Sequence, residues 1–296
     1  MNNLLSIQNL SKHYDGFDLT NINLTVPTGS VVGLIGSNGA GKTTTLKAAL
    51  GLISVDGGNV EILGTNVNKN FSSQPLAEVK QKLGIVFDAC AFPEDITVKD
   101  AATMMRFAYK NWSASTFEQY RAMFSLDPKK KIKELSRGMG MKLTLACALS
   151  HDPDFLILDE ATAGLDPMAR EEVLDIMRVF MQDENHGILM SSHITSDLEK
   201  IADYIVCVDN GQLVFSVEKD TITDLAGIAH CRSNEFEEIA ASGFFAPNTM
   251  RFAQHAYGIA VLVPDRMAFS ERFKSIAVDK ASIDDYMGML LKGGTR

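Results

Sequence analysis

A glycine-rich octapeptide, GSNGAGKT at residues 36–43, has the composition and spacing of a phosphate-binding loop. Its glycines allow backbone N–H groups to turn toward a phosphate, helped by the positive end of the helix that follows. In such a loop Lys42 bridges the β- and γ-phosphates, and the Thr43 hydroxyl ligates Mg²⁺. We therefore predict a nucleotide site formed by Gly36, Ser37, Asn38, Gly39, Ala40, Gly41, Lys42, Thr43 and Thr44.

Two neighbouring carboxylates distinguish hydrolysis from phosphoryl transfer to a hydroxyl. They end the segment FLILDE (155–160), whose four apolar residues predict a buried strand. Asp159 is expected at the carboxyl-terminal edge of the sheet, where it can hold the Mg²⁺ shell. Glu160 follows directly and is suited to orient or deprotonate an attacking water. Hydrolysis is therefore the expected reaction.

A second polar helix start occurs far from this loop. The segment ELSRGMGMKL (134–143) has Ser136 and Gly138 directly ahead of a helical run with few charges. Ser is an ordinary N-cap and Gly an ordinary turn residue, so the segment alone indicates only where a helix begins.

The elements that must position these residues alternate between strands and helices. SVVGLIG (30–36) and KLGIVFD (82–88) are apolar runs of the fully buried kind, and HGILMSSH (186–193) is a further strand. This alternation predicts an α/β fold with a mainly parallel sheet. From about residue 93 to 134 strand patterns give way to helical spacing, which indicates a helical insert.

The pattern changes beyond residue 221, where short strand-like and helix-like segments alternate without a recognisable catalytic motif. Ser282 and Asp285 predict a capping box at the start of the last helix. That helix has one apolar face made of Ile283, Tyr286, Met287, Leu290 and Leu291. We therefore predict a domain at residues 1–221 and a small α/β appendage at 222–296.

Composition and charge limit the class of protein. No apolar run approaches the ~18 residues that a membrane span needs, and the first residues do not form a signal peptide, so a cytoplasmic location is the default. The net charge is −9, and residues from 222 onward hold 8 Lys and Arg against 9 Asp and Glu. This acidic chain is a poor match for nucleic acid. The four cysteines form no C-x-x-C pair, which favours buried free thiols.

The motifs GSNGAGKT, LSRGM, FLILDE, AGLD and SSH occur in the order found in ATP-binding subunits of ABC transporters. Over about residues 4–217 the chain resembles this family. The resemblance implies a P-loop ATPase core with an antiparallel β subdomain and a helical insert at about 90–145. It also implies ATP and Mg²⁺ as ligands, and an integral-membrane permease subunit as partner. Finally, it implies a homodimer or heterodimer in which Ser136 and Gly138 contact ATP held by the second subunit.

The same resemblance gives roles to three further residues. Tyr14 matches the aromatic residue that stacks on adenine, and Asp166 in AGLD matches the residue that spans the dimer interface. His193 in SSH matches the switch histidine that contacts the γ-phosphate. A single Tyr or His is otherwise more often structural, so these roles depend on the order of the motifs.

Two segments depart from the family pattern. The usual LSGGQ is LSRGM here, because Arg137 replaces a Gly and Met139 a Gln. Asp88 in GIVFD stands where the family has a Gln that ligates Mg²⁺ and senses the membrane subunit. An Asp can bind the metal, but it is one methylene shorter and, when ionised, cannot donate a hydrogen bond. The alternative is that Asp88 only caps the next segment.

The segments VFDACAFPEDITVKD and SIDDYMGMLLKGG are most similar to ATPases of two-component bacterial ABC-2 exporters, such as YtrB-like ATPases and those of phenol-soluble-modulin exporters. This implies ATP-driven export of a peptide or another amphipathic compound, powered from the inner face of the cell membrane. The alternatives are a soluble ATPase acting on nucleic acid or the ribosome, and a low-turnover ATP sensor. The absence of a basic arm opposes the first, and Glu160 opposes the second.

Overall fold

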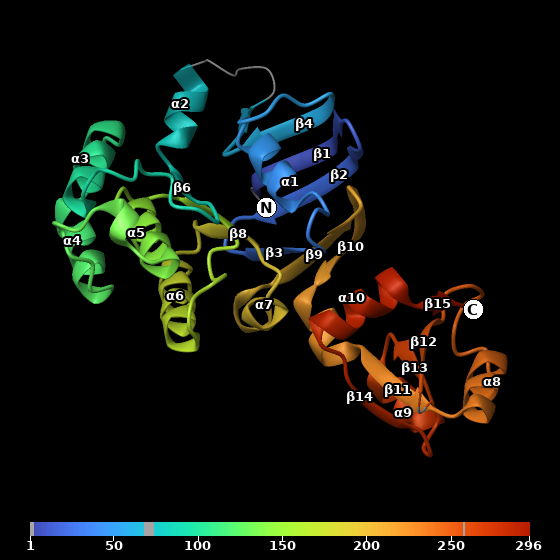
Figure 1. Ribbon diagram of the computed structural model, residues 1–296. Helices are drawn as coiled ribbons and strands as arrows, with labels where there is room; N and C mark the ends of the chain where they lie inside the picture. The colour runs from blue at the N-terminus through green and yellow to red at the C-terminus, as the bar shows by residue number, and fades with distance from the viewer. Residues whose placement is uncertain (1–2, 68–73, 257) are drawn as a thin grey trace. The chain divides into compact units, whose positions relative to one another are not determined.

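The computed structural model describes residues 3–67, 74–256 and 258–296 (Figure 1). The chain forms two compact units, Met1–Ile194 with Val208–Leu213 and Thr195–Cys207 with Val214–Arg296. The two units are not separated at one position in the sequence. The chain enters the second unit at residue 195, returns to the first at residue 208 and enters the second again at residue 214. A functional boundary at residue 221 stays a prediction.

An antiparallel sheet of order β2-β1-β4-β5 forms one layer of the first unit. Polar and apolar residues alternate along its long strands, and the apolar ones, such as Leu5 and Ile7, are buried. This pattern is typical of a sheet with one covered face. The strands are β1 (Asn3–Tyr14), β2 (Phe17–Pro27), β4 (Gly57–Ile62) and β5 (Thr65–Asn66).

Parallel strands in the order β3-β8-β7-β6 carry the predicted motifs. Every residue of β3, β7 and β8 is buried, as expected for apolar strands covered on both faces. Parallel strands end at one edge of a sheet, so the residues that follow them meet there. The bounds are β3 (Val31–Ile35), α1 (Lys42–Ala49), β6 (Leu83–Val86), β7 (Phe155–Asp159), α6 (Pro167–Phe180) and β8 (Gly187–Ser191).

The helical insert contains α3, α4 and α5, which pack side by side (Figure 1). A polar side chain begins each of them: Thr97 and Asp100 form a capping box on α3, and Ser113 and Ser136 cap α4 and α5. The bounds are α2 (Gln74–Lys80), α3 (Val98–Ala108), α4 (Ala114–Met123), the 3₁₀ turn η1 (Ile132–Glu134) and α5 (Arg137–Leu149).

The second unit is built on an antiparallel sheet of order β14-β11-β13-β12-β15. Strand β13 lies between β11 and β12, which α8 connects, and β11 lies between β13 and β14, which α9 connects. This is the double split β-α-β arrangement of ferredoxin-like folds. Strands β9 (Tyr204–Asp209) and β10 (Gln212–Glu218) are not part of this sheet, and residues 208–213 belong to the first unit. The other bounds from residue 195 onward are α7 (Thr195–Ile201), η2 (Thr221–Leu225), β11 (Gly227–Cys231), α8 (Ser233–Ala241), β12 (Arg251–His255), β13 (Gly258–Val263), α9 (Arg266–Arg272), β14 (Ala277–Lys280), α10 (Ile283–Lys292) and β15 (Gly294–Thr295).

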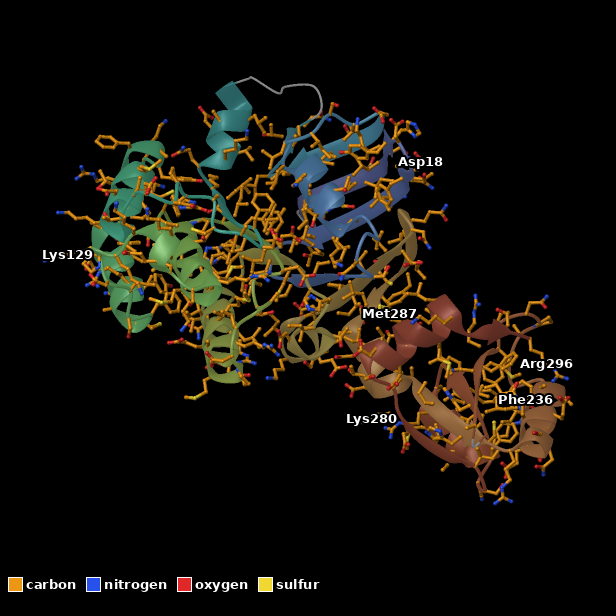
Figure 2. All side chains as sticks on the ribbon, viewed as in Figure 1. Asp18, Lys129, Phe236, Lys280, Met287 and Arg296 are labelled. Atoms are coloured by element: carbon orange, nitrogen blue, oxygen red, sulfur yellow. The ribbon has the colours of Figure 1, made fainter. Side chains whose placement is uncertain are left out.

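Apolar clusters cover both faces of the ferredoxin-like sheet. Phe236 of α8 and Phe269 of α9 pack on one face. Met289 of α10 packs with Ile228 on the other. The guanidinium of Arg296 lies 5.2 Å from the centroid of the Phe236 ring (Figure 2). Burial of these side chains is the main stabilisation of the unit.

Candidate nucleotide-hydrolysis site

The phosphate loop connects β3 to α1, and its geometry requires glycine at two positions. Gly41 is the N-cap of α1 with φ +111°, and Gly36 has φ +153°. A Cβ at Gly36 would lie 2.1 Å from the carbonyl oxygen of Val208. The ammonium of Lys42 is buried and donates to the carbonyls of Gly36 at 2.9 Å and Ser37 at 3.2 Å. The lysine therefore closes the loop on itself.

The other predicted nucleotide-binding residues lie on the same loop and on the first turn of α1. Their exposure leaves the outer side of the loop open to a ligand. Ser37, Asn38, Gly39 and Thr43 are exposed, Thr44 is half-buried, and Ala40 and Gly41 are buried.

Asp159 ends β7 and is buried. One of its carboxylate oxygens accepts the Thr43 hydroxyl at 2.8 Å, and the other accepts the hydroxyl of Ser191 on β8. A hydroxyl in contact with a carboxylate is a pair of hard oxygen donors, so Thr43 and Asp159 fit Mg²⁺. Among the described residues no three His, Cys, Asp or Glu side chains gather to hold a metal, so further oxygen ligands would complete the shell.

Glu160 leaves the strand with φ +54°, a left-handed conformation that non-glycine residues rarely adopt. Its backbone N–H donates to the Ser191 carbonyl at 3.1 Å. One carboxylate oxygen lies 2.5 Å from Nδ1 of His193, and the other lies 3.9 Å from the ammonium of Lys42. The side chain is 16% exposed. A carboxylate held in this way beside a phosphate loop is suited to abstract a proton from water.

Ser136, Gly138 and Asp166 belong to a second cluster. The Ser136 hydroxyl accepts the Met139 N–H at 3.3 Å, and a Cβ at Gly138 would lie 3.1 Å from a methyl of Leu165. Within the described part of the chain, none of the three hydrogen-bonds to the phosphate loop. The contact of Ser136 and Gly138 with the ATP of a second subunit stays a prediction.

Asp166 is the N-cap of α6, and its carboxylate accepts the N–H groups of Ala169 and Met168, both at 3.0 Å. The hydrogen bond from Ala169 lowers the pKa of Asp166 below its ordinary value, and the Met168 bond and the positive charge of Lys142 lower it further. Asp166 is therefore a charged group at neutral pH.

Tyr14 is the last residue of its strand, and Asp88 lies just beyond the end of its own. The Tyr14 ring is exposed at the end of β1, and the Lys12 ammonium lies 5.4 Å from its centroid. Asp88 is exposed two residues beyond β6 and makes no hydrogen bond or ion pair with any described residue. The structure thus provides no cap for the alternative interpretation of Asp88, and its role as a metal ligand stays a prediction.

Two polar residues at this site were not predicted from the sequence. Ser191 lies opposite Asp159 in the register of β7 and β8, and Asp209 accepts the Ser37 hydroxyl at 2.8 Å. A strand that ends in SSH beside a strand that ends in DE is a signal for the first. The turn sequence DNG after an apolar strand is a signal for the second.

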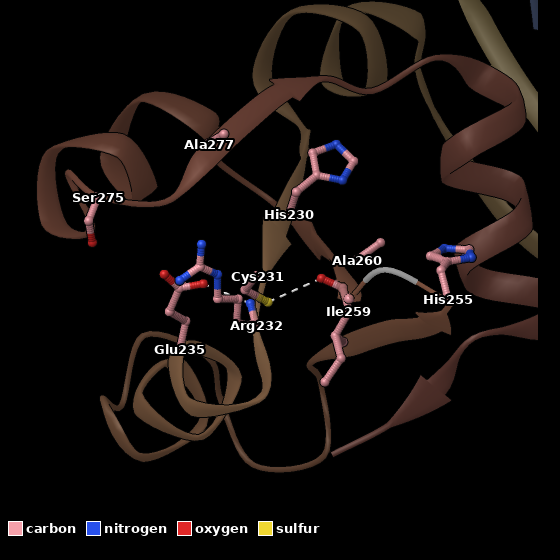
Figure 3. A pocket seen from close by; sticks show the side chains of 10 residues that line it. His230, Cys231, Arg232, Glu235, His255, Ile259, Ala260, Ser275 and Ala277 are labelled. Atoms are coloured by element: carbon pink, nitrogen blue, oxygen red, sulfur yellow. Dashed lines mark hydrogen bonds between the residues drawn. The ribbon is translucent and has the colours of Figure 1, made fainter.

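The second unit contains a cavity of about 650 Å³ (Figure 3). His230 at its edge pairs with Asp279 at 3.2 Å, and burial raises the pKa of the Cys231 thiol to about 11. Cys231 therefore remains a thiol at neutral pH and is a poor nucleophile. The lining residues are His230, Cys231, Arg232, Glu235, His255, Gly258, Ile259, Ala260, Ser275 and Ala277.

Comparison with known proteins shows the family of the chain. The ABC transporter family model matches residues 19–163. The bacitracin transport ATP-binding protein BcrA of Enterococcus faecalis is 31% identical over 259 residues, which cover 86% of this chain and 80% of that protein. The chain belongs to the ABC transporter family. The lantibiotic transport ATP-binding protein SrtF of Streptococcus pyogenes is 33% identical over 73% of this chain and 92% of its own length.

A solved structure of an ATP-binding subunit of an ABC transporter matches with a TM-score of 0.66 at 28% identity, over 74% of this chain and 91% of that one. The predicted P-loop ATPase fold is confirmed. This ABC transporter subunit binds ATP and hydrolyses it to power transport. Action on nucleic acid or the ribosome, and a role as an ATP sensor, are not favoured, because these relatives are named as ATP-binding proteins of transporters. Within the described ranges, no helix combines the length and apolar character needed to cross a bilayer.

Proposed function

We propose that the chain is the ATPase of a two-component ABC-2 exporter and drives a separate integral-membrane permease subunit. Residues 1–221 form the ATP-binding domain, and residues 222–296 form an accessory domain. The relatives named for bacitracin and lantibiotic transport support a peptide or another amphipathic compound as the substrate. The subunit works in the cytoplasm, at the inner face of the cell membrane.

The observation that carries the hydrolytic role is the contact of the Glu160 carboxylate with His193, beside Lys42. Glu160 accepts the proton of the attacking water, while His193 holds its carboxylate in place and contacts the γ-phosphate. Lys42 stabilises charge on the phosphates. Bound Mg²⁺, held by Thr43 and Asp159, would neutralise phosphate charge.

The proposed active form is a dimer of ATP-binding subunits. Ser136 and Gly138 stand at the N-terminus of α5, whose first turn has no acidic residue, and this favours an anion in front of it. They contact the γ-phosphate of the ATP held by the second subunit. The ionised Asp166 lies near them and spans the dimer interface.

The exposed apolar side chains of α3 support a docking surface for the permease. Phe107 is 80% exposed, and Met104 on the same helix is also exposed. Asp88 lies between β6 and this helix, and we include its carboxylate as a further Mg²⁺ ligand. Tyr14, at the end of β1, stacks on the adenine.

Glu160→Gln tests the proposal, because it keeps the shape of the side chain and removes the base. We expect the turnover number to fall by about 10²–10⁴ with ATP affinity retained. Glu118→Gln is the matched control, since Glu118 is an exposed carboxylate paired with Arg121 in the helical insert. Steady-state ATPase rates and ATP affinity are measured on the same preparations. Unchanged turnover in Glu160→Gln would contradict the assignment.

A further inference from the structure

The turn between β9 and β10 touches the phosphate loop at three points. The Val208 carbonyl faces Gly36, as described above, and Asp209 accepts the Ser37 hydroxyl at 2.8 Å. The third contact is the Gly211 N–H, which donates to the carbonyl of Ala40 at 2.9 Å. The start and the middle of the loop are therefore both fixed by one short segment.

The turn is itself rigid. Asn210 and Gly211 have φ of +45° and +71°, the signs that a type I′ hairpin turn requires. The Asn210 amide donates to the second oxygen of Asp209 at 2.8 Å. The Gly211 carbonyl accepts the Thr20 N–H at 2.8 Å, and a Cβ at Gly211 would lie 1.8 Å from the Asp18 carbonyl oxygen. The Asp209 carboxylate is thus held in place before it meets Ser37.

These contacts orient the peptide groups of the loop. A trans peptide unit points its C=O and its N–H in opposite directions. Because Gly211 holds the Ala40 carbonyl, the N–H of Gly41 points away from the turn, and Lys42 satisfies the carbonyls of Gly36 and Ser37. The Ala40 N–H donates to the Ser37 carbonyl at 3.1 Å, and a loop N–H that points outward, such as that of Gly41, can serve an anion.

We propose that Asp209 is a positioning residue for ATP binding, and that the Val208–Gly211 turn sets the phosphate loop in its binding conformation before ATP arrives. A loop ordered in advance binds more tightly because less entropy is lost on binding. The proposal depends on the ATP site at residues 36–43, and it is independent of the choice of Glu160 as the base.

A double-mutant cycle of Asp209→Ala and Ser37→Ala in the full chain tests the contact, with Asp209→Asn as a conservative variant. We expect Asp209→Ala to weaken ATP binding and raise KM by about tenfold, with kcat within about twofold, because a hydrogen bond to a charged acceptor is lost. Asp209→Asn should recover most of this affinity, since its carbonyl oxygen can still accept the Ser37 hydroxyl.

Asp154→Ala is the matched control, because it removes a half-buried Asp that pairs with Lys82 at the opposite end of β7. Affinity for ATP and for ADP, kcat, KM and the melting temperature are measured for every variant. Ser37→Ala changes the contact from the loop side and reports on it even if Asp209→Ala destabilises the fold.

Strong coupling in the cycle, with a KM effect, supports the proposal. Additive effects of the two substitutions, a loss confined to kcat, or no change in ATP affinity would overturn it. Failure of the wild-type chain to bind ATP would instead contradict the ATP site itself, and that outcome is distinguishable from failure of the turn alone.

Discussion

The nucleotide site and the cavity of the second unit are both lined by ionisable side chains, but these side chains are connected differently. At the nucleotide site Glu160 contacts His193 and lies near Lys42, and Asp159 contacts Thr43. At the cavity the Glu235 carboxylate accepts the N–H of Arg232 at the start of its own helix. Neither Arg232 nor His255 has an ion pair with a described residue. A cavity lined by polar side chains is therefore weaker evidence of a catalytic site than polar side chains that contact one another.

The two sheets explain this difference. In the first unit the parallel strands end at one edge, which brings residues distant in sequence into contact, as for Asp159 and Ser191. In the second unit the antiparallel strands alternate direction and place buried residues against helices on both faces. The parallel sheet therefore gathers polar residues into a site, whereas the antiparallel sheet mainly buries apolar residues in a core.

The largest expected effect is a loss of stability in the core of the second unit that leaves the nucleotide site unchanged. Phe269→Ala removes a fully buried ring of the second unit and should lower the free energy of unfolding of that unit by about 3–5 kcal/mol. ATP affinity at 25 °C should stay unchanged. Met267→Ala, on the same helix and 65% exposed, is the control and should cost less than about 0.5 kcal/mol. Denaturant titration measures the stability of both variants, and nucleotide titration measures their ATP affinity. A loss of ATP binding in Phe269→Ala would contradict the distinction drawn between the nucleotide site and the core of the second unit.

A second prediction locates the dimer interface. In a Glu160→Gln background, ATP should shift the chain from monomer to dimer, and Ser136→Arg should weaken that shift at least about tenfold, because a bulky cation would occupy the phosphate contact. Ser282→Arg is the matched control, since Ser282 is also an N-cap, on α10 of the second unit. Light scattering after gel filtration, with ADP and with ATP, measures whether each variant is a monomer or a dimer. If the control rather than Ser136→Arg abolishes the shift, the interface lies in the second unit.

The sequence predicted those features that depend on local patterns. The apolar run before Asp159 predicted its buried strand, and the Ser282 capping box is confirmed by hydrogen bonds in both directions. Features that depend on distant contacts escaped it. Strand order in the second unit did not follow from its short segments, and Met289 is buried although it lies outside the predicted apolar face of α10.

The same limit applies to the site. The residue types and order of the motifs predicted which side chains belong to it, because each motif is continuous. The contact of Ser37 with Asp209 spans 172 positions and depends on the path of the chain between them. The left-handed backbone of Glu160 was also unpredicted, because a strand pattern extends through that residue and only the turn beyond it requires the change.

The smallest expected effect is at the cavity. His255→Gln removes an exposed imidazole that has no ion pair with a described residue, so ATPase rate and ATP affinity should each stay within about twofold of the wild type. Glu160→Gln, measured in parallel, gives the scale of a residue with mutual contacts. A fall of tenfold or more in His255→Gln would mean that the cavity acts on the nucleotide site.

The position of the β9–β10 turn in the chain has a consequence for biosynthesis. The turn residue Asp209 is translated 172 residues after its partner Ser37. At about 5–20 residues per second, the ribosome takes roughly 9–34 s to bridge that interval. During this time the growing polypeptide carries a phosphate loop without the turn that holds it. A nascent chain stalled before residue 208 should therefore bind ATP weakly, and binding should strengthen once residue 211 has left the exit tunnel.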